Sequence, residues 1–166
     1  MNREPTSTMV STRLTAILLW VFPLTYLIHI AEEYWGGEGY PAYILRLRGV
    51  HLSTTRFLAA QSVGFFLVTI GVLLARRLHF PQMMLIVMGT IVFVNSLTHT
   101  VTAITSSTYG PGLVSSIIIW MPLGLFVLIR YRGAVSRKRY GMAIAIGVSV
   151  NVIIGIFTMR GGQIAG

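Results

Sequence analysis

Five long apolar segments divide this chain, and its charged residues gather between them. The segments cover about residues 14–31, 57–75, 83–103, 113–129 and 142–159. Each is close to the roughly 20 residues that a helix needs to cross about 30 Å of hydrocarbon. The pattern predicts an all-α integral membrane bundle of five transmembrane helices, in a single transmembrane domain over residues 1–166. The first and fourth segments are short, so the alternative makes one of them a re-entrant or interfacial segment.

The longest connection between the segments covers residues 34–55 and is rich in aromatic and glycine residues. Aromatic rings concentrate at the headgroup level of a membrane, so this loop should lie at the interface. Residues 41–48 suit a short interfacial helix, which would serve either as a lid over a site or as a surface anchor.

The composition supports a membrane protein, and the charges give it an orientation. The chain is 54% hydrophobic and 10% charged with a mean hydropathy of +0.75, which leaves too little polar surface for a soluble globule of 166 residues. Nine of the thirteen basic residues fall in the same alternate loops: Arg3, Arg13, Arg76, Arg77, Arg130, Arg132, Arg137, Lys138 and Arg139. Positive residues gather on the cytoplasmic side, so we expect a cytoplasmic N-terminus and an outer C-terminus.

Charge and cysteine content also exclude several functions. The net charge of +9 is explained by membrane topology, so we predict membrane lipid and not nucleic acid as the partner. The chain has no cysteine, which excludes disulfides, thiolate nucleophiles and cysteine metal sites. Any metal site must therefore use histidine, carboxylate or other oxygen ligands.

Polar residues from two distant segments are expected to meet near the outer face. His29, Glu32 and Glu33 lie at the outer end of the first segment, and residues three and four apart share one face of a helix. The third segment runs in the same direction, so Asn95 and His99 lie in its outer half, again four residues apart. The loop that opens the fourth segment reaches the same side. The predicted topology thus places three segments around one pocket.

These residue types suit a metal site. His29 and His99 offer two nitrogen ligands and Glu32 or Glu33 an oxygen, a set that binds zinc or a similar divalent ion, and we choose Glu33 as the ligand. The remaining glutamate would then act as general base toward a metal-bound water, with Asn95 orienting a histidine or the substrate. The alternative without metal is an acid-base pair, in which a glutamate polarises His29. His51 and His79 fall in loops and are left outside the site.

At these residues the chain resembles the HXXEE domain family of small multi-pass membrane proteins. The resemblance rests on His29-Ile30-Ala31-Glu32-Glu33 with the following Tyr34-Trp35-Gly36-Gly37, on Asn95-Ser96-Leu97-Thr98-His99, and on Tyr109-Gly110-Pro111-Gly112. The family has no established reaction, but its motifs have suggested a membrane-embedded enzyme. The resemblance implies a site that also includes Tyr109 and Pro111, and we expect these two residues and Gly112 to contact the substrate.

The fifth segment carries small residues at four-residue spacing, at Ala143, Gly147, Asn151 and Gly155. Such a face lets a second helix approach closely, while Asn151 can bond across the contact. The stripe therefore predicts helix association, either inside the bundle or in a homo-oligomer or larger membrane complex.

We accordingly predict a membrane-embedded enzyme of hydrolase type that acts on a lipid-like substrate from the outer leaflet. It would be a multi-pass protein of the cell membrane, the inner membrane in a bacterium, with its site facing the periplasm or exterior. The alternative is a structural or accessory subunit of a larger complex, in which the cluster acts as polar glue between helices. A transporter or proton relay is a third interpretation, but the inner halves of the segments carry almost no polar residues for it.

Overall fold

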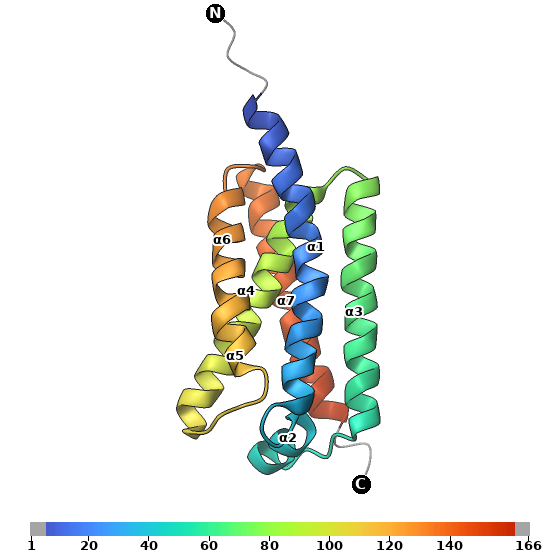
Figure 1. Cartoon of the computed structure of the whole chain (residues 1–166), viewed down its shortest axis with the longest axis vertical. Coiled ribbons are helices and arrows are strands. Elements are labelled where there is room, and N and C mark those ends of the chain that lie inside the picture. The colour runs from blue at the N-terminus through green and yellow to red at the C-terminus, as the bar shows by residue number, and fades with distance from the viewer. Residues whose placement is uncertain (1–5, 162–166) are drawn as a thin grey trace, which may run out of the picture.

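A computed structural model of the chain describes the backbone of residues 6–161 and the side chains of residues 12–158 (Figure 1). Within these residues all regular structure is helical. The elements are α1 (Thr6–Trp35), α2 (Tyr40–Arg48), α3 (Thr54–Arg77), α4 (Pro81–Ser106), α5 (Leu113–Ser115), the π-helix η1 (Ser116–Trp120), α6 (Met121–Tyr131) and α7 (Arg137–Gly161). The predicted all-α class is confirmed.

Five helical stretches are long and apolar enough to cross a membrane. They cover Thr12–Trp35, Thr54–Arg77, Pro81–Ser106, Leu113–Tyr131 and Arg137–Thr158. The fourth joins α5, η1 and α6 into one stretch of 19 residues, and the first has 24, so neither of the two short segments needs a re-entrant path. The five predicted spans are therefore confirmed, and the helices extend a few residues beyond the apolar segments at most ends.

Helix α4 is at the centre of the bundle. It packs most extensively against α6 and α7 and also contacts α1 and α3. In Figure 1, α3 and α6 lie on opposite sides of α1, and α2 lies across one end of the bundle. The start of α1 and the end of α7 are at opposite ends, as an odd number of spans requires.

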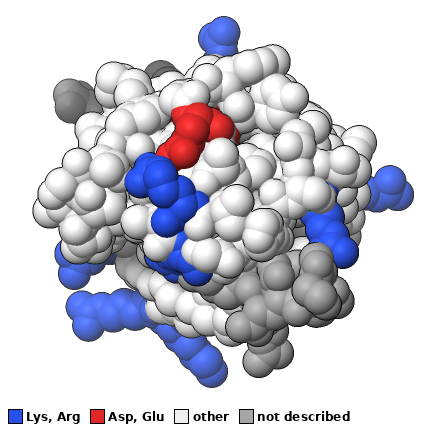
Figure 2. Space-filling view, turned by 90° about the horizontal axis from the view of Figure 1, so that it is seen from below, with Lys and Arg blue, Asp and Glu red and all other residues white. Residues whose placement is uncertain are grey.

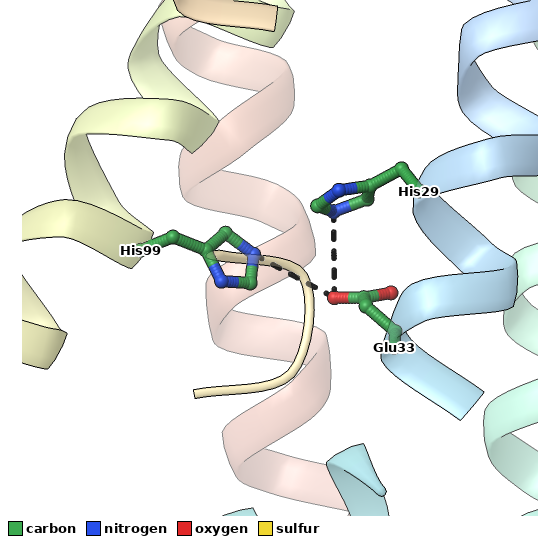
Figure 3. A group of neighbouring side chains, drawn as sticks. All are labelled: His29, Glu33 and His99. Carbon is green, nitrogen blue, oxygen red and sulfur yellow. Dashed lines mark ion pairs between the residues drawn. The ribbon is translucent and has the colours of Figure 1, made fainter. Parts of the chain in front are cut away.

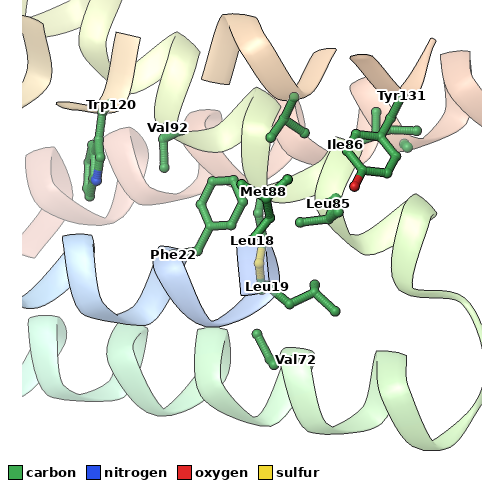
Figure 4. Close-up of a cluster of buried hydrophobic side chains, with 12 residues drawn as sticks. Leu18, Leu19, Phe22, Val72, Leu85, Ile86, Met88, Val92, Trp120 and Tyr131 are labelled. Atoms are coloured by element: carbon green, nitrogen blue, oxygen red, sulfur yellow. The ribbon is translucent and has the colours of Figure 1, made fainter. Parts of the chain in front are cut away.

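The core lies between α1, α3, α4 and the fourth span, and it also includes Ala143 of α7 (Figure 4). Leu19, Val72, Leu85, Ile86 and Val127 are completely buried there. Other large apolar side chains point outward from all five spans, which is the expected distribution for helices that contact lipid. The core also contains a buried polar pair, in which the Thr15 and Tyr131 hydroxyls lie 2.8 Å apart.

The helix predicted over residues 41–48 is present as α2. Glycines in positive-φ conformations bound it, with Gly39 at φ 75° before it and Gly49 at φ 67° after it. Tyr43 and Ile44 are buried against the bundle, so α2 covers this end of the protein. Arg46 forms an exposed ion pair with Glu38, with 2.6 Å between Nη2 and Oε1.

Basic side chains are distributed unevenly between the two ends of the bundle. In the part with described side chains, the end opposite α2 carries Arg13, Arg76, Arg77, Arg130, Arg132, Arg137, Lys138 and Arg139. The α2 end carries Arg46, Arg48 and Arg56. Figure 2 views this second end, where an acidic patch lies beside basic side chains on a largely uncharged face. By the positive-inside rule, the α2 end is expected outside the cell.

The small-residue face of α7 packs largely against α4. Ala143 is buried, and Asn151 Nδ2 donates to the carbonyl of Ile91 at 3.2 Å. A Cβ at Gly147 would lie only 2.6 Å from the Cβ of Thr90, whereas one at Gly155 would meet nothing within 4 Å. Three of the four predicted positions thus serve contacts inside the chain, and an oligomeric contact remains a prediction.

Substitution of Gly147 should test this packing, because an added methyl group has no space there. We expect Gly147→Ala to destabilise the bundle by about 1–3 kcal/mol through overpacking. Gly155→Ala, on the same helix, serves as the control and should unfold at or above the wild-type temperature. Thermal unfolding in detergent measures both, and equal stability of the two variants would contradict the α4–α7 contact.

Candidate metal centre

His29 and Glu33 face the interior of the bundle from the last turns of α1. Their four-residue spacing puts them on one face, and they are 2% and 5% exposed. His29 Nε2 lies 3.6 Å from Glu33 Oε1. A buried carboxylate at this depth needs compensation, because burying an isolated charge costs several kcal/mol.

His99 reaches the same carboxylate from α4. Its Nε2 also lies 3.6 Å from Glu33 Oε1, so both imidazoles converge on one oxygen (Figure 3). The two rings meet edge to face, with their centroids 5.1 Å apart. In the described part of the chain these three side chains form the group able to hold a metal ion, with one ligand atom from each lying within 4.8 Å of the others. The predicted meeting of the first and third spans is confirmed.

Two of the distances between the ligand atoms suit a small divalent ion, and all three atoms lie within 4.8 Å of one another. Ligands at about 2.0–2.1 Å from zinc in a tetrahedron are about 3.4 Å apart. The two distances of 3.6 Å are close to that value and longer than a hydrogen bond. Two imidazoles and one carboxylate leave a fourth position open, as in catalytic zinc sites.

Ser115 fixes the orientation of His29. Its Oγ lies 2.8 Å from His29 Nδ1 and 3.3 Å from the Gly112 carbonyl oxygen, to which it donates. The hydroxyl oxygen is therefore available to accept a proton from Nδ1, which places the lone pair on Nε2. Asn95 Nδ2 lies 3.4 Å from Nε2, and an amide donor there fits the same tautomer. A histidine that donates through one ring nitrogen is prepared to bind a metal through the other.

Gln61 on α3 supports Glu33. Its Nε2 donates to Glu33 Oε2 at 2.5 Å, while its Oε1 accepts from the Tyr26 hydroxyl at 2.7 Å. This chain of bonds holds the carboxylate so that Oε1 faces the histidines. It also brings the second span into the site, a contribution that the sequence analysis missed.

Trp120, the last residue of the π-helix η1, packs against the ring of His29. The two rings stack with their centroids 3.8 Å apart and an interplanar angle of 28°. Trp120 Nε1 donates to Thr25 Oγ1 at 3.2 Å, which anchors the indole to α1. A π-turn inserts one extra residue into a helix and often occurs at functional sites. Here it turns a large ring toward the candidate ligand.

Gly112 closes one side of the group with its backbone. Its φ of +89° favours glycine, and a Cβ there would lie 2.8 Å from Cε1 of both His29 and His99. The adjacent Pro111 is fully buried. These predicted site residues are thus next to the three ligands and act by close packing, while their predicted contact with substrate remains untested.

Glu32, although adjacent to Glu33, has different partners. It accepts from the backbone N–H groups of Val114 and Ser115, at 2.8 and 2.6 Å, and from the Tyr109 hydroxyl at 2.8 Å. The carboxylate therefore caps the fourth span, where free N–H groups favour a negative charge. Partial burial and the bond to Glu32 raise the pKa of Tyr109 to about 12, so this hydroxyl remains a donor at neutral pH.

Helix α2 adds a neutral tyrosine near the group. Tyr40 stacks on Phe57 with ring centroids 5.7 Å apart. Burial and the nearby Glu33 carboxylate raise the pKa of Tyr40 above its usual range. Neither His51 nor His79 belongs to the described group of ligands, in agreement with the sequence analysis.

The bundle and its buried His-Glu-His group define the class as a small multi-pass membrane protein with a candidate metal centre. The chain belongs to the family described as proteins of unknown function with an HXXEE motif, whose profile matches residues 20–127. The match includes all three candidate ligands. Comparisons with curated proteins and with solved structures give no match.

Removal of the Glu32 charge should weaken the connection between α1 and the fourth span. A glutamine at position 32 keeps the size but loses one of the two accepting oxygens, so we expect Glu32→Gln to reduce stability by about 1–3 kcal/mol. Glu38→Gln is the control, because its partner Arg46 is on the surface and exposed ion pairs contribute little. Thermal unfolding of both variants in detergent measures the difference. A Glu32→Gln variant as stable as Glu38→Gln would show that the cap is unimportant.

Proposed function

We propose that His29, Glu33 and His99 bind a divalent metal ion such as zinc. We further propose that the protein is a membrane-embedded hydrolase acting on a lipid-like substrate from the outer leaflet. The observation that carries this proposal is the placement of two imidazole nitrogens 3.6 Å from one carboxylate oxygen, inside a bundle of membrane-spanning helices.

Electrostatics favours a cation at this position. Glu33 is a carboxylate buried in an apolar surrounding, where an uncompensated negative charge is costly. A divalent ion would reverse that charge and use the lone pairs that the surroundings already orient. Ser115 and Gln61 supply the outer hydrogen bonds that histidine and carboxylate ligands of metals usually have.

The chemistry of such a site is hydrolysis or a related acid-base reaction. A bound zinc ion polarises a carbonyl or phosphoryl group and makes a water molecule acidic. Asn95 is the neutral polar side chain placed beside the ligands to orient substrate or water. Glu32 already accepts three hydrogen bonds, which leaves about one of its four acceptor sites for the predicted role as general base.

The alternative function is structural: in an accessory subunit, the same cluster would hold the helices together through polar contacts. The packing around the site favours it: Gly112, Trp120 and Pro111 leave little free space beside the ligands. Metal binding and catalysis distinguish the two functions, so each has its own test.

Metal content tests the first part of the proposal. We expect purified wild-type protein to contain close to one zinc or similar ion per chain, and His99→Ala to lose most of it, because one of three ligands is removed. The control His51→Ala has the same number of histidines as His99→Ala and should retain the metal. Elemental analysis of detergent-purified protein gives the ratio. Wild-type protein that remains metal-free after incubation with zinc and dialysis would refute the metal site.

The lipid content of cells tests the second part. We expect Glu33→Gln to abolish activity and change the abundance of at least one lipid species, because the variant loses the anionic ligand. Mass spectrometry of lipid extracts from cells expressing wild-type or Glu33→Gln protein compares them, with Glu38→Gln as the control. The wild-type protein must be folded and contain metal in this comparison. Identical lipid extracts would then favour the structural function.

A further inference from the structure

A shallow groove runs along the outside of the bundle between the end of α1 and the start of the fourth span. It has a volume of about 360 Å³. Most of its lining residues are apolar, and Glu32, Tyr109 and Ser115 are the polar ones. The lining residues are Ile28, Glu32, Tyr109, Val114, Ser115, Ile118 and Ile119.

The groove faces the surroundings of the bundle. Ile28, Val114 and Ile118 are 51%, 50% and 68% exposed, so their side chains contact whatever surrounds the helices. Both walls belong to helices that are long and apolar enough to span a membrane. Hydrocarbon is the medium expected along such walls.

We propose that this groove binds one acyl chain of a membrane lipid and presents that lipid to the metal centre. The inference rests on the proposed function and specifies its substrate as an acyl-chain lipid that approaches sideways from the bilayer. Two observations support a lipid as the bound molecule: the direction of the groove along the membrane-spanning helices, and its connection to His29 through Ser115.

The alignment matches a lipid molecule. Tyr109 and Glu32 mark the end of the groove at the edge of the fourth span, where an amphipathic ring suits the headgroup level. Ile119 is six residues inside that span, about 9 Å deeper at the rise of an α-helix. An acyl chain beside Ile118 and Ile119 would therefore have its polar end near Tyr109.

Ser115 connects the groove to the candidate metal centre. It lines the groove, and its hydroxyl lies 2.8 Å from His29 Nδ1. The polar group of a bound lipid would thus be separated from the ligand His29 by the side chain of Ser115 alone. A smaller groove of about 260 Å³ between α1 and α3 has Gln61 and Ser62 on its lining but no carboxylate or tyrosine at its rim. The larger groove therefore suits a lipid with a polar head better.

Photo-crosslinking tests the proposal in the full-length protein. The probe is phosphatidylethanolamine with a diazirine in one acyl chain, added to nanodiscs that contain the purified protein. We expect labelled peptides from the segments around Ile28 and Ile118, identified by mass spectrometry. Ile118→Trp should fill the groove and lower this labelling about tenfold, since about two buried methylene groups contribute that much to binding.

Ile117→Trp is the matched control, because Ile117 is also exposed on η1 but does not line the groove. It should leave the labelling unchanged. If Ile118→Trp does not fold, Ile28→Trp blocks the groove from the opposite wall and replaces it. Equal labelling of all lipid-facing helices, or labelling concentrated on residues 58–66, would overturn the proposal.

Metal content separates this proposal from the proposed function. Ile118→Trp should keep wild-type metal, because position 118 contacts none of the three ligands. Metal present without preferential labelling would refute the groove alone. Absence of metal in the wild type would refute the metal centre, whatever the labelling pattern.

Discussion

The buried carboxylate of Glu33 is the constraint around which the half of the bundle nearer α2 is arranged. It is 5% exposed inside helices that surround it with apolar side chains, where an unpartnered carboxylate is costly. The partners come from three directions: His29 from the same helix, His99 from α4 and Gln61 from α3. These contacts, of which the one from Gln61 is a hydrogen bond, connect α1 to α3 and α4 at this depth. The site and the helix packing at this end therefore depend on the same carboxylate.

The two adjacent glutamates contact different partners, because successive residues on a helix point about 100° apart. Glu33 shares the face of His29 and turns into the bundle, while Glu32 points toward the fourth span. There it binds the N–H of Ser115, the residue whose hydroxyl orients His29. The histidine thus lies beside the carboxylate of Glu33 and is linked to that of Glu32 through Ser115. This geometry gives a physical reason for two neighbouring glutamates after the histidine.

The sequence was sufficient for the parts of this arrangement that depend on length, polarity and direction. Apolar segments predicted the five spans, and alternating basic loops placed His29 and His99 at one depth, where the structure brings them together. The sequence was not sufficient to predict which helices pack side by side, because the distribution of charges gives only the direction of each span. Gln61 and Ser115 were polar residues in apolar segments and could have been noticed, but their partners depend on packing. The π-turn that directs Trp120 to His29 has no comparable signal in the pattern.

The packing around the ligands restricts how any substrate could reach them. At the α2 end, Tyr43 and Pro111 are buried, and the Gly112 backbone lies against both histidines, so described residues pack closely on that side of the ligands. On the lipid side, Ser115 is the only residue of the larger groove that also bonds to a candidate ligand among the described contacts. A substrate that already resides in the bilayer needs only to move along this groove. The packed α2 end and the grooved side are therefore the two physical reasons behind the proposal of a membrane lipid as substrate.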